Sequence, residues 1–399
     1  MVSHYSEDGI LFLQTQNVKP FFIDLAHSVR IDRDFHEQLP KSMVRKGNVL
    51  LARSGSFGTA SIYLDEDVVN AADIIIVDLD RNGGISPLYL VAFMNSKYGV
   101  GQLLRFASGG LQGHVNLRIL ESFKIPLLET KLQDEIGKIV TDAYKARQKS
   151  AAAYDAACAL LSSALKENEL KFDHPLSYTT RFSDVMREGR ADADFFQVPF
   201  MQMQEHLDKL KSAPLSSLVD FVKGVEVGSN SYAENGKLFM RVSNLTEHGM
   251  KSNASDKLIP DDLYRSLAGA FQPKQGELLL TKDGTPGISW VVDRPIECIV
   301  SGAIVRLLPK KSDVPPEYLA LAINATLCRM QVEQQASGAL ILHWKLPLIK
   351  KLRIPLCDKD TMKEIARLVK ESKRQQYKSE SLLAAAKSRV EELIEAAAK

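Results

Sequence analysis

The stretch Gly47-Asn-Val-Leu-Leu-Ala-Arg-Ser-Gly55 recurs as Gly276-Glu-Leu-Leu-Leu-Thr-Lys-Asp-Gly284, displaced by 229 residues. Further motifs repeat in the same order at this displacement. A constant offset of this length indicates a duplicated domain, because solenoid proteins repeat about every 20 to 50 residues. The matching pairs are Pro87-x-Tyr-Leu with Pro316-x-Tyr-Leu, Asn95 with Asn324, Ser108-Gly with Ser337-Gly, His114 with His343, and Ile125-Pro-Leu with Ile354-Pro-Leu.

Upstream of this stretch the repeat continues with a small drift in offset. Gly9-Ile-Leu-Phe-Leu-Gln-Thr-Gln-Asn17 corresponds to Gly236-Lys-Leu-Phe-Met-Arg-Val-Ser-Asn244. Two halves of such similar sequence predict a molecule with pseudo-twofold organisation.

The composition is that of an ordinary globular protein. The chain has 399 residues, of which 45% are hydrophobic and 25% charged, so disordered and collagen-like classes are excluded and two or three domains are expected. Lys and Arg number 51 against 49 Asp and Glu. A polyanion site must therefore come from local clustering of charge rather than from a global basic field.

Cysteine usage and hydropathy indicate the compartment. The four cysteines are far apart and form no C-x-x-C pair, which argues against a zinc knuckle and a disulfide framework. No signal peptide and no run of about 18 apolar residues occurs. We therefore expect a cytoplasmic protein without membrane contact. The cysteines are Cys158, Cys298, Cys328 and Cys357.

In each half, short strand-like runs precede one long helical stretch. The runs 48–52, 61–64 and 74–77 are rich in aliphatic residues and are separated by Gly and Ser turns. The first helix is predicted to open with a capping box at Thr130-x-x-Gln133, and the second near Thr361-x-x-Glu364. Roughly 38 helical residues at 1.5 Å rise would make a rod of about 55 to 60 Å.

Both helical stretches have coiled-coil spacing. Steps of four and three trace seams that are apolar at the ends and polar or small in the middle. This pattern favours an antiparallel pair; the alternative is two unrelated surface helices, each packing on its own domain. The seam positions are Ile136, Val140, Ala143, Arg147, Ser150, Tyr154, Ala157, Leu161 and Ala164 in the first helix, and Ile365, Val369, Ser372, Gln376, Ser379, Leu383, Ala386, Val390 and Leu393 in the second.

The order of these motifs resembles the specificity subunits of type I restriction–modification systems. The resemblance covers nearly the whole chain and rests on motifs that each occur twice in the same order. They are Gly-x-Leu-Phe-x-x-x-x-Asn, Gly-x-x-Leu-Leu-x-[Arg/Lys]-x-Gly, Pro-x-Tyr-Leu, Ser-Gly before Ile-Pro-Leu, and the long helix that follows. The segment Arg190-Ala-Asp-Ala-Asp-Phe-Phe196 also looks like the family's domain-opening segment.

The resemblance implies an α+β fold with two duplicated β-rich target-recognition domains and two long antiparallel coiled-coil-like helices as spacer. It implies recognition domains at 1–128 and 172–357, a central conserved helix at 129–171 and a C-terminal conserved helix at 358–399. Each recognition domain would read half of a bipartite site in double-stranded DNA. Methyltransferase (modification) subunits would dock on the helices and a restriction subunit would join them.

One departure from the family pattern concerns the start of the first half. Residues 172–235 have no counterpart there, so about 60 residues of the first recognition domain are expected to be absent and that domain to be incomplete at its N-terminus. If the absent part merely flanks the β core, the domain can still fold. If it supplies core strands, the exposed edges become an aggregation liability.

Two turns that follow strands suit contact with a phosphate. Phosphates are held by Arg, Lys, Ser, Thr or backbone N–H groups, and glycine lets the backbone approach a ligand closely. An ordinary hairpin turn with a solvated cation is an equally good interpretation. The candidates are Arg53, Ser54 and Ser56 in the first half and Lys282, Asp283 and Thr285 in the second.

Polar residues that end the Gly-x-Leu-Phe strands are candidates for reading bases. Positions 14 and 16 would lie on one face of a strand. The two halves differ there, as readers of different targets should, although a merely exposed polar face would look the same. The candidates are Gln14, Gln16 and Asn17 against Arg241, Ser243 and Asn244.

Two further segments are weaker candidates. Gln112 lies in the Ser-Gly to His114 segment and becomes Ile341 in the second copy, and the shared histidine is interpreted as structural. The basic stretch at 345–353 suits phosphate contact through Lys350 and Lys351, but would equally be a solvated face.

The sequence contains no signature of catalysis. The acidic run at 78–83 fits the start of a calcium loop, but its twelfth position is Tyr89 where a bidentate Glu is needed, so a turn is expected. No phosphate loop, dinucleotide fingerprint or methyltransferase tetrad occurs. We therefore expect a non-catalytic chain that binds no metal and no cofactor, with S-adenosylmethionine held by the partner methyltransferase.

Three alternatives to this function remain. The chain could be the specificity module of another phage-defence DNA methyltransferase system. It could be a coiled-coil scaffold without DNA binding, or it could carry cleavage or methylation activity itself.

Overall fold

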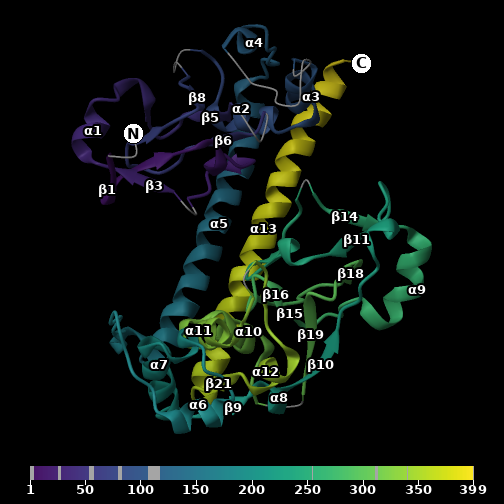
Figure 1. The fold of residues 1–399 in the computed structure, drawn as a ribbon. Helices are drawn as coiled ribbons and strands as arrows, with labels where there is room; N and C mark the ends of the chain where they lie inside the picture. The colour runs from purple at the N-terminus through teal and green to yellow at the C-terminus, as the bar shows by residue number, and fades with distance from the viewer. Residues whose placement is uncertain are drawn as a thin grey trace. The chain divides into compact units, whose positions relative to one another are not determined.

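The computed structural model describes residues 4–25, 28–53, 58–79, 83–106, 117–253, 255–310, 313–338 and 340–398. It consists of two compact units, Met1–Ser150 with Lys373–Lys399 (unit 1) and Ala151–Ser372 (unit 2). Both units mix strands with helices, which confirms the predicted α+β fold (Figure 1). The two long helices, α5 (Thr130–Ala164) and α13 (Lys359–Ala397), each contribute one end to each unit.

Unit 1 contains two four-stranded sheets with the orders β3-β1-β7-β4 and β2-β6-β5-β8. The aliphatic run Val49–Ala52 is buried along its whole length and pairs antiparallel with a strand on each side. A continuous apolar run of this kind is typical of a central strand covered on both faces. The strands are β1 (Tyr5–Leu13), β2 (Phe21–Phe22), β3 (Val29–Ile31), β4 (Met43–Val44), β5 (Val49–Ala52), β6 (Ala60–Ile62), β7 (Val69–Ala71) and β8 (Ile74–Val77).

Helices cover the β5 sheet of unit 1. The buried side of α2 joins β5, β6 and the first part of α5 in one hydrophobic core. A proline at the first position of α2 supplies a backbone angle suited to a helix start. The helices besides α5 and α13 are α1 (Arg33–Glu37), α2 (Pro87–Met94), α3 (Lys97–Phe106) and α4 (Leu117–Glu121), with 3-10 turns η2 (Thr15–Asn17) and η3 (Pro40–Ser42).

Unit 2 repeats this arrangement with additions. Its larger sheets have the orders β10-β19-β15-β17 and β14-β11-β18, and three two-stranded ladders join β12 to β13, β16 to β20 and β9 to β21. The strands are β9 (Ser212–Pro214), β10 (Val219–Lys223), β11 (Lys237–Met240), β12 (Leu245–Thr246), β13 (Gly249–Met250), β14 (Lys257–Ile259), β15 (Leu278–Thr281), β16 (Asp283–Gly284), β17 (Ser289–Val291), β18 (Cys298–Val300), β19 (Ile304–Pro309), β20 (Leu342–His343) and β21 (Arg353–Pro355).

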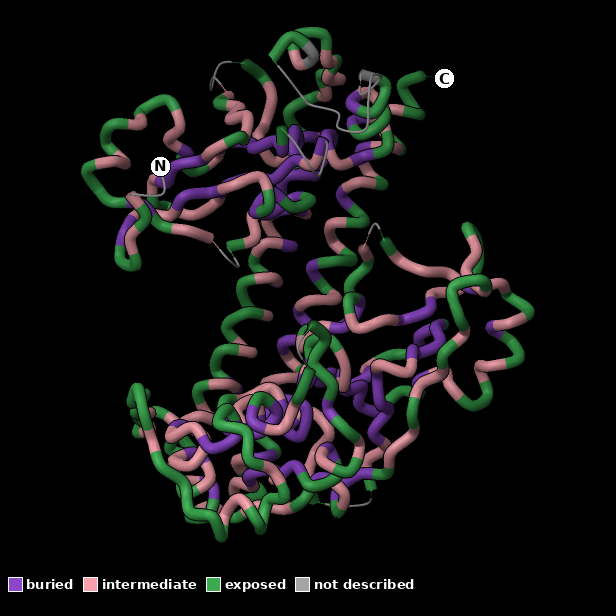
Figure 2. Tube along the Cα trace, in the orientation of Figure 1, coloured by how far each residue is buried: buried purple, intermediate pink, exposed green. Residues whose placement is uncertain are grey.

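The helices of unit 2 surround its β15 sheet and enclose the largest core of the described residues. Figure 2 shows the buried residues concentrated in the strands and on the inner side of the helices. The helices are α6 (Phe182–Glu188), α7 (Val198–Asp208), α8 (Leu215–Leu218), α9 (Asp261–Phe271), α10 (Pro316–Asn324), α11 (Thr326–Gln335) and α12 (Leu346–Lys351), with 3-10 turns η4 (Glu167–Glu169), η5 (Ala193–Phe196), η6 (Ser229–Ser231) and η7 (Val242–Asn244).

Within each unit the two long helices pack against each other. In unit 1, Arg389 Nε donates to Glu135 Oε1 at 2.8 Å, and Ser379 Oγ donates to the Ala143 carbonyl at 2.9 Å. Residue numbers rise along α5 as they fall along α13, so the helices are antiparallel, as predicted. The alternative, in which each helix packs only on its own domain, is wrong because α13 enters the core of unit 1 and α5 the core of unit 2.

The predicted seam is correct over the first part of α5 and drifts toward its end. Ile136, Val140 and Ala143 are fully buried. Near the end of α5, however, Leu165 is buried and Ala164 is exposed. A straight α-helix rotates by about 20° per heptad relative to a strict 3.5-residue repeat, so a seam extrapolated over its length slips by one residue.

The helix starts differ in detail from the predicted capping boxes. Gln133 does not cap α5; its amide donates to the Leu128 and Gly84 carbonyls and accepts the Ser86 amide, so it ties the helix to the preceding loop. The second helix starts at Lys359, two residues before Thr361. Asp358 accepts the amide of Thr361 at 2.9 Å and is the residue that caps it.

The duplication is visible in matching hydrogen bonds. Tyr89 donates to the Pro126 carbonyl at 2.8 Å, and Tyr318 donates to the Pro355 carbonyl at 2.7 Å. The Pro-x-Tyr-Leu and Ile-Pro-Leu motifs are thus two ends of one contact in each unit. Asn95 binds the carbonyl of residue 60 and Asn324 that of residue 289, both at 2.8 Å. These repeated residues hold the helix that follows the sheet onto a strand.

A repeated glycine is required sterically. Gly58 and Gly287 both have positive φ, of 76° and 92°. A Cβ atom at these positions would meet Leu103 at 2.9 Å and Val332 at 3.1 Å, and these two residues also correspond at the 229-residue displacement. Only glycine combines this backbone angle with such close packing.

Residues 172–235, which have no counterpart in the first half, pack over part of unit 2. β10 pairs antiparallel with β19 along the edge of the sheet, and β9 pairs with β21. Helix α7 packs against α11 and η5. The segment is therefore not a mere flank, since it closes two strand edges of unit 2.

Candidate nucleic-acid interface

The loop after β1 presents two glutamines of unit 1. β1 ends at Leu13, and residues 15–17 form a 3-10 turn, so the prediction that positions 14 and 16 share a strand face is wrong. The turn nevertheless brings the two side chains together, because Gln16 Nε2 donates to Gln14 Oε1 at 3.1 Å. Gln16 is exposed and Gln14 half-buried.

Asn17 supports this loop from inside. Its side chain accepts the Gln14 amide at 2.8 Å and donates to the Asp24 carbonyl at 2.8 Å and to Ser28 Oγ at 3.1 Å. The residue is fully buried. It therefore positions the loop and has no surface with which to reach a base.

The corresponding loop of unit 2 has the same construction. Asn244 is fully buried, accepts the Arg241 amide at 3.0 Å and donates to the Lys251 carbonyl at 3.1 Å. Arg241 folds back on its own unit, with Nη2 donating to the Ser255 carbonyl at 2.6 Å. Its Nε is buried without a hydrogen-bond partner among the described residues. Ser243 is exposed at the tip of the turn.

Arg53 borders a surface hollow in unit 1. The hollow has a volume of about 340 Å³, and apolar residues such as Ile75 and Leu117 line it together with Ser42. Arg53 is exposed and makes only a loose ion pair with Asp73, at 3.9 Å. Lys41, also exposed, lies on the same hollow. The predicted partners Ser54 and Ser56 lie outside the described residues.

Lys41 was not found from the sequence. Its counterpart at the 229-residue displacement is Ala270, so the repeat carries no signal for it. It meets Arg53 only because the η3 turn and the end of β5 adjoin the same hollow.

In the Lys282 turn of unit 2, the positive charge of the lysine is paired with a neighbouring carboxylate. Lys282 forms an ion pair with Asp283, and both side chains are about four-fifths buried. Asp283 also contacts His343 Nδ1 at 2.7 Å, and the two residues face each other across the β16–β20 ladder. Thr285 is exposed beside them. The structure thus joins two segments that the sequence indicated separately, the Lys282 turn and the segment ending at His343.

The remaining candidates lie apart from this ladder. Lys350 and Lys351 are exposed at the end of α12, and Lys350 Nζ lies 5.7 Å from the centre of the Phe221 ring. Arg353 does not extend their basic stretch, because Asp208 binds it at 2.5 Å. Gln112 and His114 lie outside the described residues.

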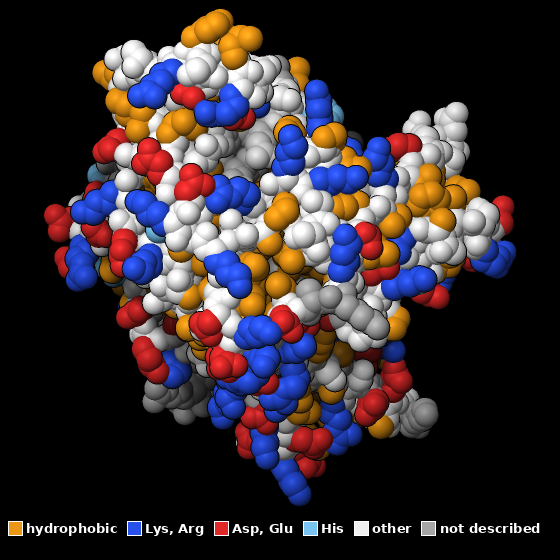
Figure 3. All heavy atoms as spheres, turned by 90° about the horizontal axis from the view of Figure 1, so that it is seen from below, with side chains coloured by type: hydrophobic (Ala, Val, Ile, Leu, Met, Phe, Trp, Pro, Cys, Tyr) orange, Lys and Arg blue, Asp and Glu red, His pale blue; other side chains and the backbone are white. Residues whose placement is uncertain are grey.

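The charges of the surface are mixed. On the face shown in Figure 3, Lys and Arg side chains lie among Asp and Glu, and several Lys and Arg side chains gather in the lower middle of the view; the net charge of the chain is +2. A polyanion at this surface would therefore meet individual exposed cations, such as Arg53, Lys41 and Lys350, rather than a uniform positive field.

The described residues include no cluster suited to a metal ion, and two of the thiols are held in their protonated form. Among them no group of three or more His, Cys, Asp or Glu is placed to hold a metal ion. Burial raises the pKa of Cys298 to about 12 and that of Cys158 to about 11, so both thiols are protonated near neutral pH. Asp80 and Asn82 of the acidic run lie outside the described residues. No described helix combines the length and apolarity needed to cross a membrane.

A family comparison identifies the class of domain. The model of the type I restriction modification DNA specificity domain matches residues 16–151. This range holds the Arg53 turn, the Pro-x-Tyr-Leu motif and the first part of α5. These residues are thus similar to the type I restriction–modification DNA specificity domain, and the resemblance drawn from the repeated motifs is confirmed. At the level of the family, the function is DNA specificity and not catalysis, as expected.

The comparison with solved structures found subunits of type I restriction–modification systems. The type I restriction–modification S subunit from M. genitalium is 10% identical, with 97% of this chain and 92% of that chain covered and a TM-score of 0.43. The HsdS subunit from Thermoanaerobacter tengcongensis is 14% identical, with 96% and 89% covered and a TM-score of 0.31. No curated protein matches the chain. TM-scores this low do not establish a shared fold, so the assignment rests on the family match and the repeated motifs.

Proposed function

We propose that this chain reads a bipartite sequence in double-stranded DNA, one half-site with each unit. The observation that carries the proposal is the family match over residues 16–151 together with the recurrence of its motifs, and of their hydrogen bonds, in the second half. A duplicated reader in one chain suits a target of two separated parts. The proposed recognition domains are 1–128 and 172–357, with helical regions 129–171 and 358–399 between and after them.

In unit 1 the proposed DNA contacts surround the hollow and the neighbouring loop. Arg53 and Lys41 would hold phosphates, because exposed cations supply the sequence-independent part of binding. Gln14 and Gln16 would read base edges, since an amide offers both a donor and an acceptor. This set is exposed or half-buried, whereas Asn17 only supports the loop.

In unit 2 the proposed contacts come from the corresponding loops. Ser243 takes the place of Gln16, and Thr285 lies beside the neutralised Lys282 turn. Lys350 and Lys351 would hold phosphates. The exposed sides of α5 and α13 would dock methyltransferase subunits, which would hold S-adenosylmethionine, and a restriction subunit would join that assembly.

The experiment starts with the chain co-expressed and co-purified with a type I methyltransferase subunit. Mapping of methylated adenines should give a target of two short parts separated by unspecified base pairs. The isolated chain should then bind a duplex with this target, measured by fluorescence anisotropy, with an affinity that falls steeply as salt rises. Salt-independent binding, or a target of one continuous part, contradicts the proposal. Methyl transfer by the chain freed of partners would also overturn it.

A further inference from the structure

The buried asparagines Asn17 and Asn244 each fix the backbone of the residue seven positions further along the chain. In unit 1, Asn17 Nδ2 donates to the Asp24 carbonyl and the Asp24 amide donates to the Asn17 carbonyl, both at 2.8 Å. In unit 2, the same two bonds join Asn244 to Lys251, at 3.1 Å and 2.7 Å. The two units therefore share one backbone clasp, but its outer residue is an acid in unit 1 and a lysine in unit 2.

This clasp places Lys251 beside Ser243, the exposed residue at the tip of the unit 2 turn. Asn253 Nδ2 donates to the Ser243 carbonyl at 2.8 Å and, more weakly, to the Lys251 carbonyl at 3.4 Å. Lys251 itself is exposed, and no ion pair of the described residues includes it. The acid of the same loop, Asp256, accepts hydrogen bonds from the Asn244 side chain and the Asn253 amide. The lysine is thus held by its backbone, and its ammonium group is available to a ligand.

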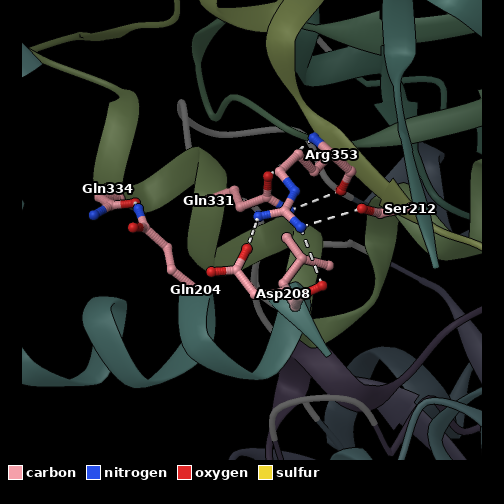
Figure 4. A network of polar contacts seen from close by, with 7 residues as sticks. Gln204, Asp208, Ser212, Gln331, Gln334 and Arg353 are labelled. Atoms are coloured by element: carbon pink, nitrogen blue, oxygen red, sulfur yellow. Dashed lines mark hydrogen bonds and ion pairs between the residues drawn. The ribbon is translucent and has the colours of Figure 1, made fainter. Parts of the chain in front are cut away.

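Three other cations near the candidate turns and the basic stretch of unit 2 are bound within the unit. The guanidinium of Arg241 is folded back onto a backbone carbonyl, and Lys282 is paired with the carboxylate next to it. Figure 4 shows Arg353 held in a similar way, by Asp208 at 2.5 Å and by Ser212 Oγ at 3.2 Å. The lysine of the clasp therefore takes on particular weight as a cation beside the exposed tip of the turn.

The acid at the same position of unit 1 faces a different surrounding. Arg147 of α5 lies nearby, and its Nη2 donates to the Ile23 carbonyl at 2.8 Å. Burial lowers the pKa of Arg147, and the charge of the Asp24 carboxylate opposes this shift. In unit 1 the clasped residue therefore supports a buried cation, while exposed cations are supplied by Arg53 and Lys41.

We propose that Lys251 holds a backbone phosphate of the DNA, next to the base pair that Ser243 reads. This inference rests on the proposed function and adds to it a residue that does in unit 2 what Arg53 and Lys41 do in unit 1. Phosphate contacts fix the register of a protein on the duplex. A cation locked beside the reading residue therefore determines which base edge that residue reaches. An ammonium group suits this role, because it is a compact charge with three donors that can turn toward a phosphate.

The first test follows the binding of the full chain to a duplex carrying its mapped target over a salt series. Lys251→Ala should reduce the slope of log affinity against log salt by about 0.9 unit, the value for one phosphate contact on B-form DNA. Lys251→Arg should keep the slope, because the charge is retained. Lys171→Ala, at another exposed lysine of unit 2, is the matched control and should leave the slope unchanged. Equal slopes for Lys251→Ala and Lys171→Ala overturn the proposal.

The second test locates the phosphate. Single phosphates along the half-site of unit 2 are replaced by neutral methylphosphonates. One replacement, next to the base pair whose preference is relaxed by Ser243→Ala, should weaken binding of the unaltered chain as much as Lys251→Ala does. It should have no further effect on the Lys251→Ala chain, because the contact is already lost. Additive losses at every position overturn the proposal.

Two further outcomes separate this inference from the function on which it rests. Relaxed preference at one base pair with an unchanged salt slope would make Lys251 a base reader and overturn the phosphate contact. Steep salt dependence of the unaltered chain, combined with no effect of Lys251→Ala, contradicts this inference alone. If the unaltered chain binds no duplex, the proposed function fails together with it.

Discussion

The turn after β5 in unit 1 and the turn after β15 in unit 2 occupy the same place in the repeat but present different charge. Arg53 is exposed and only loosely paired with Asp73. Lys282 is largely buried in an ion pair with Asp283, which also binds His343. Both halves therefore keep a cation directly after the corresponding strand, while the availability of that cation has diverged. Two repeats on one scaffold can differ in this way without any change of fold.

A second contrast lies at the start of the same strands. Asn48 accepts the Arg45 amide at 2.7 Å, and Glu277 accepts the Lys274 amide at 3.0 Å. Glu277 additionally holds the guanidinium of Arg306 through two bonds of 2.8 Å. The same local turn thus carries a buried ion pair in unit 2 and a neutral amide in unit 1.

The largest expected effect comes from removing the buried Glu277–Arg306 ion pair of unit 2. Glu277→Ala leaves the buried Arg306 guanidinium without its carboxylate and should destabilise unit 2 by about 3 to 5 kcal/mol. Asn48→Ala should cost unit 1 about 1 to 3 kcal/mol. Because all four cysteines lie in unit 2 and Cys298 and Cys328 are buried there, alkylation of these two thiols reports unfolding of that unit alone, and amide exchange of β5 reports unit 1.

The control for this pair of variants removes both charges. Replacing Glu277 and Arg306 together by Leu should recover most of the lost stability, since no unpaired charge remains buried. A larger loss for Asn48→Ala than for Glu277→Ala would show that the ion pair does not support unit 2.

The next effect concerns the two repeated tyrosines. Tyr89→Phe should destabilise unit 1 by about 1 kcal/mol, because one net hydrogen bond is lost. Tyr318→Phe should cost unit 2 about twice as much, since Tyr318 also accepts the Cys357 amide at 3.2 Å. The free energy of unfolding of each unit, from the same two probes, checks this order. Equal losses would mean that the second contact contributes nothing.

The Tyr89 contact also predicts a dependence on pH. Burial raises the pKa of Tyr89 from 10.0 to about 12. Its contribution to stability is complete below the unfolded pKa of about 10 and is lost as pH rises toward 12. Tyr89→Phe should flatten the fall of unit 1 stability over this range.

A smaller effect tests whether Arg53 and Lys282 contact DNA phosphates. Arg53→Ala should reduce the slope of log affinity against log salt by about one unit, because an exposed, loosely paired cation that would hold a phosphate is removed. Lys282→Ala should change the slope less. In an Asp283→Asn background Lys282 is released, and the same substitution should then cost as much as Arg53→Ala. Identical slopes for Arg53→Ala and Lys282→Ala in the unaltered chain would contradict the neutralisation of Lys282.

The smallest expected effect tests whether each unit reads one half of the target. Gln16→Ala and Ser243→Ala should each relax preference at one base pair, by on the order of 1 kcal/mol. Methylated-adenine mapping of the co-purified complex should show the two changes in different halves of the target. Glu66→Ala, another exposed position of unit 1, should change neither half. Changes in the same half would disprove the division.

Local sequence patterns predicted the elements better than the contacts. The aliphatic run at 48–52 and the helix start at Thr130 are correct because burial periodicity and strand length are written in neighbouring residues. The role of Gln133 was missed, since its partners lie at residues 84–86 and 128. The inward position of Asn17 was missed as well, because the chain turns into η2 one residue after β1 ends.

By itself the sequence determined the duplication, the order of strands and helices, and the antiparallel seam, because each is encoded in a repeat or a period along the chain. The tertiary structure alone decided which polar side chains are available. Asp283 pairs with Lys282 and also contacts His343, 60 residues away, and Lys41 joins Arg53 at one hollow. β19 is covered by β10, whereas β8 has a strand on one side only among the described residues. Availability depends on what distant segments place beside a side chain, and no local pattern contains that information.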